Sequence, residues 1–347
     1  MKMILHRWQL PLAHPFTISR GTITTQESLV VELVQDGKHG YGEVTTNDFY
    51  GHTYESMEAS LGRLGRTLDR YAQSMPETQW ETMLAELGND MFAMSALDMA
   101  AHDLHGKLTG LPTWRRWGLQ WENVPQSSYT IGIDTIDKML AKLSERPDWG
   151  IYKIKLGTDN DLEIIEALRS HTAATFRVDA NCGWTAEQTI ANSHRLAELG
   201  VEFIEQPLPP EASSEDKRRV YLQSALPIIA DEDCQVAGDV EQCYRRYHGV
   251  NVKICKCGGL TPALRMLRQA RSLKLKTMVG CMVESAIGIS GAAHLLPLLD
   301  YADLDGAVLL ADAPATGVVV ENGLVQLTEL AGNGGSLLKS RLAEFKG

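Results

Sequence analysis

Ile151-Tyr152-Lys153-Ile154-Lys155-Leu156-Gly157 alternates between apolar and basic residues, which is typical of a β-strand. Neighbouring side chains of a strand point to opposite faces, so Lys153 and Lys155 share one face and the apolar residues take the other. Two ammonium groups on one face repel each other. If that face is enclosed, repulsion and burial both lower the lysine pKa values, and a neutral lysine can act as a base near pH 7. The alternative is an exposed edge strand that carries two lysines.

The length and composition favour a globular enzyme. The 347 residues suffice for a large domain with a smaller one, or for an α/β barrel with additions, and 44% are hydrophobic and 22% charged. The net charge of −11 argues against nucleic acid or an anionic membrane as the main partner, because both are polyanions. We also expect a homo-oligomer, of a size that the sequence does not define.

The sequence gives no sign of a membrane span or a secretion signal. No apolar run approaches the ~20 residues that a membrane helix needs. Charged residues also interrupt the N-terminus too early for the apolar core of a signal peptide. We therefore expect a cytoplasmic protein.

All of the cysteines lie in the second half of the chain, and none forms a Cys-x-x-Cys pair. In reducing cytoplasm they are expected to be free thiols. The Cys255-Lys256-Cys257 segment has the donors for a soft metal, although buried thiols account for it equally simply. The six are Cys182, Cys234, Cys243, Cys255, Cys257 and Cys281.

The first 45 residues favour antiparallel strands. Residues 29–34 are apolar, residues 36–40 supply a turn, and residues 41–44 return as a second strand. Two polar loops, residues 14–22 and 45–53, contain Pro, Gly and aromatic residues. Such loops often cover a site.

Residues 54–119 have a helical pattern. Apolar residues recur at helical spacing over residues 95–107, and the helix is expected to end near Gly110. The many small residues suit close packing against a neighbouring element. Asp98 and Asp103 in this helix are therefore expected to serve structure rather than catalysis.

From residue 127 onward, short apolar strands alternate with helical segments. Eight β-α steps in fewer than 200 residues fit a closed parallel barrel better than a doubly wound sheet. No Gly-x-Gly-x-x-Gly or Walker loop follows the first strand, which counts against a nucleotide-binding fold. The predicted strands are residues 128–133, 151–156, 176–180, 201–205, 228–231, 250–253, 277–279 and 302–305, and the clearest helices are 161–171, 185–199, 261–273 and 285–296.

Acidic residues stand at the ends of three successive predicted strands, where a parallel barrel places its chemistry. Asp179, Glu205 and Asp231 are 26 residues apart, one β-α unit each. Three carboxylates that point at one axis repel unless a cation lies between them. Hard oxygen ligands with positions left open for substrate and water favour Mg²⁺. Alternatively, each acid pairs with an arginine or a helix N-terminus, which requires a separate coincidence on each strand.

Lysines on both sides of such a metal suggest a reaction. Lys155 comes from the second strand and Lys253 from the sixth, so they face each other across a barrel. A substrate carboxylate on Mg²⁺ would place its α-carbon between them, and the ion would stabilise the enediolate formed on proton loss. One lysine would remove the α-proton and the other would return one from the opposite face. Lys153 would lower the pKa of Lys155 or hold the developing oxyanion.

With these residues the chain resembles the enolase superfamily, in its muconate-lactonizing subgroup. The likeness extends from the first strand to at least Leu310. It implies a modified (β/α)₇β TIM barrel over residues 121–311, an α+β capping domain over residues 1–120, and a segment 312–347 that returns to the capping domain. Mg²⁺ would be held by the three strand-end acids. The motifs that carry the likeness are Lys153-Ile154-Lys155, Val178-Asp179-Ala180-Asn181, Ile204-Glu205-Gln206-Pro207, Ala230-Asp231-Glu232 and Asn251-Val252-Lys253 before Gly258-Gly259.

Within that subgroup, Asp303-Leu304-Asp305 on the last strand is similar to the Asp-x-Asp of dipeptide epimerases. Two carboxylates at the barrel mouth can bind the free ammonium of a dipeptide while the metal binds its carboxylate. Muconate and succinylbenzoate have no ammonium for such a pair. Alternatively, the two aspartates cap a following helix.

Further residues are expected around this centre. Arg20 in the first loop matches a position that can meet an acidic side chain, which favours an Ala-Glu dipeptide. Asp48 would instead favour a cationic side chain, and Phe49 or Tyr50 an apolar one. The other candidates are Thr130 and Glu284 as substrate contacts, and Asn181, Glu232 and Lys256 as residues behind the ligands.

The preferred interpretation is a Mg²⁺-dependent dipeptide epimerase acting on the C-terminal residue of an L-Ala-X dipeptide. A lyase or cycloisomerase, such as o-succinylbenzoate synthase, would use the same lysines. Acid-sugar dehydration is disfavoured because no histidine stands at the end of the sixth or seventh strand. A barrel that binds Mg²⁺ and a peptide without catalysis is the non-enzymatic alternative.

Overall fold

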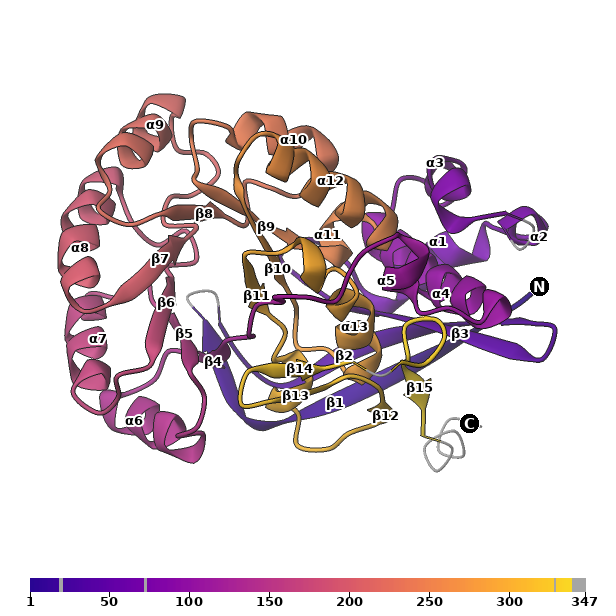
Figure 1. The fold of residues 1–347 in the computed structure, drawn as a ribbon, viewed down its shortest axis with the longest axis horizontal. Helices are drawn as coiled ribbons and strands as arrows, with labels where there is room; N and C mark the ends of the chain where they lie inside the picture. Colours follow the sequence, from indigo (N-terminus) through magenta and orange to yellow (C-terminus); the bar gives the residue numbers. More distant parts are fainter. Residues whose placement is uncertain (19–20, 72–73, 328, 339–347) are drawn as a thin grey trace.

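The computed structural model describes residues 1–18, 21–71, 74–327 and 329–338. A parallel barrel forms one half of the molecule, and an antiparallel sheet with helices covers one side of it (Figure 1). None of the helices in these residues is long and apolar enough to cross a membrane.

The barrel has eight parallel strands in chain order. A parallel bridge between Ser127 and Ala302 joins the first strand region to the last, and Ser128 N donates to Ala302 O at 3.2 Å. These contacts bring the two edges of the sheet together, so the predicted modified TIM barrel is confirmed. The strands are β4 (Tyr129–Ile131), β5 (Ile151–Lys155), β6 (Thr175–Asp179), β7 (Val201–Glu205), β8 (Ile228–Ala230), β9 (Gly249–Lys253), β10 (Lys276–Gly280) and β11 (Tyr301–Asp303).

Helices cover the outside of the barrel (Figure 1). Most residues of the strands are buried, and β5 alternates apolar residues with the buried lysines Lys153 and Lys155. The helices start with local caps: Thr185 accepts from Gln188 N in a capping box, and Ser213 accepts from Asp216 N. The helical elements are α6 (Ile136–Glu145), α7 (Asp161–Arg169), α8 (Ala186–Glu198), α9 (Ser214–Gln223), α10 (Ala237–Cys243), α11 (Ile254–Cys257), α12 (Leu260–Ser272), α13 (Ala286–Ala293), and the 3₁₀ turns η1 (Leu296–Leu298) and η2 (Gly306–Leu309).

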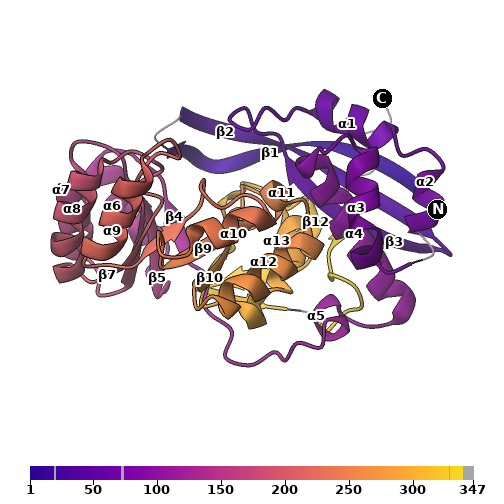
Figure 2. The same cartoon turned by 90° about the horizontal axis from the view of Figure 1, so that it is seen from above.

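The N-terminal sheet consists of β1 (Lys2–Ile18), β2 (Gly21–Gln35) and β3 (Lys38–Thr45) in that order. Asp36 and Gly37 form the predicted turn with positive φ angles of 51° and 72°, as a two-residue hairpin turn requires. Figure 2 shows β1 and β2 reaching from the sheet along the barrel toward β4. Helices α1 (Tyr54–Gly62), α2 (Thr67–Tyr71), α3 (Pro76–Glu86), α4 (Met91–Thr109) and α5 (Thr113–Arg116) follow the sheet.

Buried polar contacts fix this capping domain on the barrel. Asp98 of α4 accepts from Thr261 N and Oγ1 of α12, both at 2.8 Å. Glu43 of β3 accepts from Ser285 N and Gly288 N at the start of α13, both at 3.0 Å. At the far end of β1, Ile133 N donates to Thr17 O at 2.9 Å. The capping domain is therefore held at several points around the end of the barrel that the carboxyl ends of the strands form.

The C-terminal tail packs beside the capping domain. Its strands pair with one another in the described residues. The segment also contacts the capping domain through Asn333, whose N donates to Asp103 Oδ1 at 2.6 Å. Asp103 thus serves structure, as expected. The tail strands are β12 (Ala315–Thr316), β13 (Val319–Glu321), β14 (Leu324–Gln326) and β15 (Ser336–Leu337).

The close approach of β3 to α4 depends on glycine. A Cβ atom on Gly42 would lie 2.6 Å from Ala100 N and still closer to Ala96 O. We expect Gly42→Ala to lower the free energy of unfolding by about 1–3 kcal/mol, because backbone would have to move in a packed interface. Gly62→Ala is the matched control, since its Cβ meets nothing within 4 Å and alanine favours the helix by up to about 1 kcal/mol. Urea unfolding of both variants measures this, and equal midpoints would contradict the close packing.

Candidate active site

The ends of β6, β7 and β8 bring three carboxylates together inside the barrel. Asp179, Glu205 and Asp231 are buried, and one oxygen from each lies within 4.8 Å of the others. Asp179 stands opposite Glu205 in the register of β6 and β7. The barrel therefore places the three predicted metal ligands around one point.

This acidic triad fits a magnesium ion. Burial together with the charges of Asp179 and Asp231 raises the pKa of Glu205 to about 7. Such repulsion among buried anions requires nearby positive charge. The donor set contains only carboxylate oxygens and carries three negative charges, which is the chemistry that Mg²⁺ prefers over softer metals.

Lys153 and Lys155 enter the triad from β5. Lys155 Nζ donates to Asp179 Oδ2 at 2.6 Å. Lys153 Nζ lies 2.8 Å from Glu205 Oε2 and 3.3 Å from Asp179 Oδ2. Only 1% of the Lys153 side chain is exposed. The shared face that strand alternation predicted is thus the inner face of the barrel, and the alternative of an exposed edge strand is wrong.

Mutual repulsion of the two lysines predicts a lowered pKa for Lys153, but the structure favours a raised one. Burial by itself lowers this pKa, but the charges of Asp303, Glu205 and Asp179 outweigh it and hold the pKa well above its ordinary value. The acidic groups around Lys153 therefore favour its protonated form.

Lys253 reaches the triad from the opposite side. Its Nζ donates to Asp231 Oδ2 at 2.8 Å from the end of β9. Burial opposes the charged form of Lys253, but the charge of Asp231 raises its pKa well above the ordinary value. Lys256 in α11 is fully buried and donates to Asp231 Oδ1 and to Asp231 O, both at 2.6 Å. Lys256 thus contacts Asp231 from the helix that follows β9, while Lys253 is the lysine at the strand end.

The Asp303 and Asp305 pair lies beside this centre. Asp303 Oδ2 accepts from Lys153 Nζ at 2.8 Å, and its Oδ1 accepts from Ser128 Oγ at 2.7 Å. Asp305 Oδ2 accepts from Thr130 N at 2.6 Å, and Asp303 Oδ1 accepts from Thr130 Oγ1 at 3.4 Å, so Thr130 contacts both members of the pair. Burial and the charge of Asp303 raise the pKa of Asp305 to about 7. The two aspartates bind groups of the barrel wall and do not cap a following α-helix.

The remaining residues predicted for the site lie around the carboxylate triad rather than within it. Asn181 N donates to Asp179 Oδ1 at 2.9 Å, and Glu232 is buried next to Asp231. Glu284 accepts from Met282 N at 2.8 Å, and burial together with Glu43 raises its pKa to about 8. Arg20 lies outside the described residues.

Comparisons with known proteins agree with this geometry. Residues 2–118 match the mandelate racemase/muconate lactonizing enzyme N-terminal domain, and residues 137–340 match the enolase C-terminal domain-like family. The chain is 49% identical over 338 residues to an L-Ala-D/L-amino acid epimerase of Flavobacterium johnsoniae, covering 97% of this chain and 100% of that protein. The chain belongs to the enolase superfamily.

Two other proteins broaden the comparison. An L-Ala-D/L-Glu epimerase of Bacteroides thetaiotaomicron is 39% identical, over 96% of this chain and 87% of that protein. The dipeptide epimerase of Enterococcus faecalis, crystallised with Mg and the dipeptide L-Leu-L-Tyr, superposes with a TM-score of 0.87 at 29% identity, covering 96% of this chain and 99% of the other.

Some contacts of this enolase-superfamily site were not assigned from the sequence. Asn251 Nδ2 donates to Glu205 Oε1 at 2.8 Å, and Gln206 bridges two strand ends. Strand alternation indicates that Asn251 lies on the same face of the strand as Lys253, because it precedes Lys253 by two residues. Tyr50 from the capping domain is close enough for the charges of Lys256, Asp231 and Lys253 to influence its pKa, which burial raises to about 12. Tyr50 lies in the loop of residues 45–53, which the sequence predicts to cover a site.

We expect Glu205→Gln to weaken Mg²⁺ binding by more than about 100-fold, because even partners behind a metal ligand account for 10- to 100-fold. Isothermal titration calorimetry measures this. Glu202→Gln on the same strand is the matched control, since Glu202 pairs with Arg177 at 2.8 Å instead of joining the triad. Equal Mg²⁺ affinities of the two variants would show that the triad is not the metal site.

Proposed function

We propose that the protein is a dipeptide epimerase, an isomerase that uses Mg²⁺ and inverts the α-carbon of the C-terminal residue of a dipeptide. One observation carries this proposal: Lys155 and Lys253 touch opposite members of the buried triad, Asp179 and Asp231. A carbon acid between these amines is accessible to one lysine from each face. The similarity to epimerases over the whole chain supports the same reaction.

In this proposal Lys155 and Lys253 each carry out one of the two proton transfers. In one direction Lys155 takes the α-proton and Lys253 delivers a proton to the opposite face, and the reverse reaction exchanges their roles. Mg²⁺ held by the triad would offset the negative charge that develops on the substrate carboxylate. Lys153 stays protonated between Asp303 and Glu205, where its charge favours the same developing anion.

The barrel wall provides a site for the substrate amine. Asp303 and Asp305 supply two buried carboxylates beside Lys153, which separates them from the triad. A dipeptide can therefore place its ammonium at the pair and its carboxylate at the metal. A dicarboxylate such as an o-succinylbenzoate precursor leaves the pair without a partner, so this geometry favours epimerisation over the lyase and cycloisomerase reactions.

For the substrate range we propose L-Ala-X dipeptides, on the basis of the Flavobacterium relative named an L-Ala-D/L-amino acid epimerase. Ala-Glu remains the specific prediction tied to Arg20. Among the described residues of the capping loop, Phe49 is 55% exposed, and its ring packs edge-on against Tyr50 with centroids 4.9 Å apart. These rings suit an apolar X, so a panel of side chains is the appropriate test.

We also propose a cytoplasmic location. The six cysteines are thiols rather than disulfides, which supports a reducing compartment. A homo-oligomer stays a prediction from the sequence, which sedimentation velocity would test.

Incubation with Mg²⁺ and an L-Ala-X panel in D₂O tests the reaction. We expect one deuterium at the α-carbon of the C-terminal residue, detected as a mass increase, with inversion of that centre. Lys155→Ala removes one of the two proton carriers and should abolish inversion. Lys276→Ala is the matched control, because Lys276 begins β10 at the other end of the barrel and pairs with Asp300. Inversion by Lys155→Ala at the normal rate would refute the assignment, and binding of dipeptides without exchange would indicate a non-catalytic barrel.

A second prediction concerns the amine site. Asp305→Asn should raise KM for free-amine dipeptides by about 10- to 100-fold, because hydrogen bonds to charged groups contribute about 1.5–3 kcal/mol. N-acetylated dipeptides should lose no further activity in this variant, since they lack the ammonium. Asp300→Asn serves as control, because Asp300 pairs with Lys276 away from the site. An unchanged KM together with undiminished lyase activity on a dicarboxylate would favour the o-succinylbenzoate synthase alternative.

A further inference from the structure

Gln206 follows the metal-ligand candidate Glu205 and occupies an unusual backbone position. Its φ angle is +31°, in a region that residues other than glycine rarely adopt, and Pro207 restricts its conformation further. The residue is also completely buried. Such a conformation persists only where surrounding contacts stabilise it.

The backbone of Gln206 joins the strands on both sides of β7. Cys182 N, beyond the end of β6, donates to Gln206 O at 2.8 Å. Gln206 N donates to Ile229 O of β8, also at 2.8 Å. The positive φ directs these groups toward two different neighbours immediately after Glu205.

The side-chain amide makes four further hydrogen bonds. Its Oε1 accepts from Asp231 N at 2.8 Å and from Asp233 N at 3.2 Å. Its Nε2 donates to Leu208 O at 2.8 Å and to Tyr247 Oη at 3.3 Å. These partners fix the orientation of the amide, because two backbone N–H groups face Oε1 and a carbonyl faces Nε2. Both acceptor sites and both donor hydrogens are thus used.

We propose that Gln206 is a positioning residue that holds the three metal-binding carboxylates at their mutual spacing. One carboxylate belongs to the preceding residue. The second is on Asp231, whose backbone N binds the Gln206 amide, and the third is on Asp179, whose strand continues to Cys182. This inference rests on the magnesium site of the proposed function, and it assigns a role in metal affinity to a residue that does not touch the metal.

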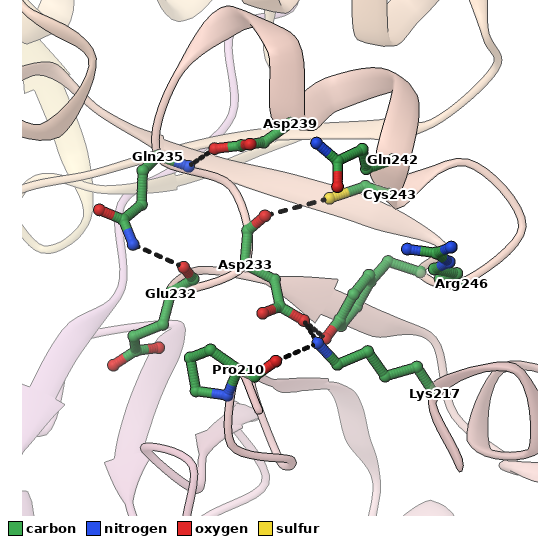
Figure 3. Close-up of a pocket in the computed structure, with 10 residues that line it drawn as sticks. Pro210, Lys217, Glu232, Asp233, Gln235, Asp239, Gln242, Cys243 and Arg246 are labelled. Carbon is green, nitrogen blue, oxygen red and sulfur yellow. Dashed lines mark hydrogen bonds and ion pairs between the residues drawn. The ribbon is translucent and has the colours of Figure 1, made fainter. Parts of the chain in front are cut away.

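A polar network behind the amide stabilises this arrangement. Tyr247 accepts from Gln206 and donates to Asp233 Oδ2. Lys217 Nζ lies 2.7 Å from Asp233 Oδ2 and donates to Pro210 O at 2.7 Å. Figure 3 shows the amine of Lys217 pointing toward Asp233 and Pro210 in a polar pocket. The residues that line this pocket therefore connect to the Gln206 amide through Tyr247 and Asp233.

Calorimetric Mg²⁺ titration of the full-length protein and its variants tests this role. Binding by the unmodified protein comes first, and its absence would refute the magnesium assignment rather than the role of Gln206. We expect Gln206→Met to weaken Mg²⁺ binding by about 10- to 100-fold, the usual effect of losing a partner behind a metal ligand. Methionine keeps the length of the side chain and removes all four hydrogen bonds of the amide.

Two further variants separate positioning from general stability. Tyr247→Phe removes one partner of the amide and should weaken Mg²⁺ binding several-fold, which tests the proposal even if Gln206→Met does not fold. Asn333→Ala is the matched control: it removes a buried amide bonded to Met99 O and Thr113 Oγ1 and should lower the melting temperature without changing Mg²⁺ affinity. Wild-type Mg²⁺ affinity in folded Gln206→Met, or in Tyr247→Phe, would overturn the proposal.

Discussion

The structure depends on the balance of charge around three buried carboxylates. Asp179, Glu205 and Asp231 cannot lie this close in a dry interior without compensation, because isolated buried charges are strongly unfavourable. Four lysines, two on each side, supply that compensation, and each lies within 2.8 Å of a carboxylate oxygen of the triad. Three of these four amines, those of Lys153, Lys155 and Lys253, are also the ones that the proposed reaction uses. Stability and chemistry therefore depend on one cluster.

The barrel explains why so much of this cluster can be predicted from the sequence. Each β-α unit brings the next strand end to the same edge, so acids and lysines 22–26 residues apart in the chain become neighbours in space. Strand alternation then selects the inner face, and it places Lys153, Lys155 and Lys253 correctly. Both rules are local, and they hold because the closed sheet repeats one geometry around its axis.

Contacts between segments that lie far apart in the chain could not be predicted from the sequence. The pair of lysines on β5 suggested repulsion and a low pKa, since only neighbouring residues can be considered in a strand pattern. Asp303, 150 residues later, reverses the sign by accepting from Lys153. The proposed role of Gln206 could not be predicted for a related reason. Its positive φ angle and its hydrogen bond to Asp231 follow from no periodic pattern in the sequence.

The capping loops belong to a different part of the fold from the barrel strands. Tyr50 belongs to a domain with its own core, yet the charges of Lys253 and Asp231 influence its pKa. This proximity arises because Glu43 and Asp98 bind that domain to the barrel. The proposed proton transfers belong to the strand ends, and the proposed contact with the substrate side chain belongs to these loops. In this proposal a substitution in the loops can therefore change the dipeptide preference while the triad and its lysines keep their positions.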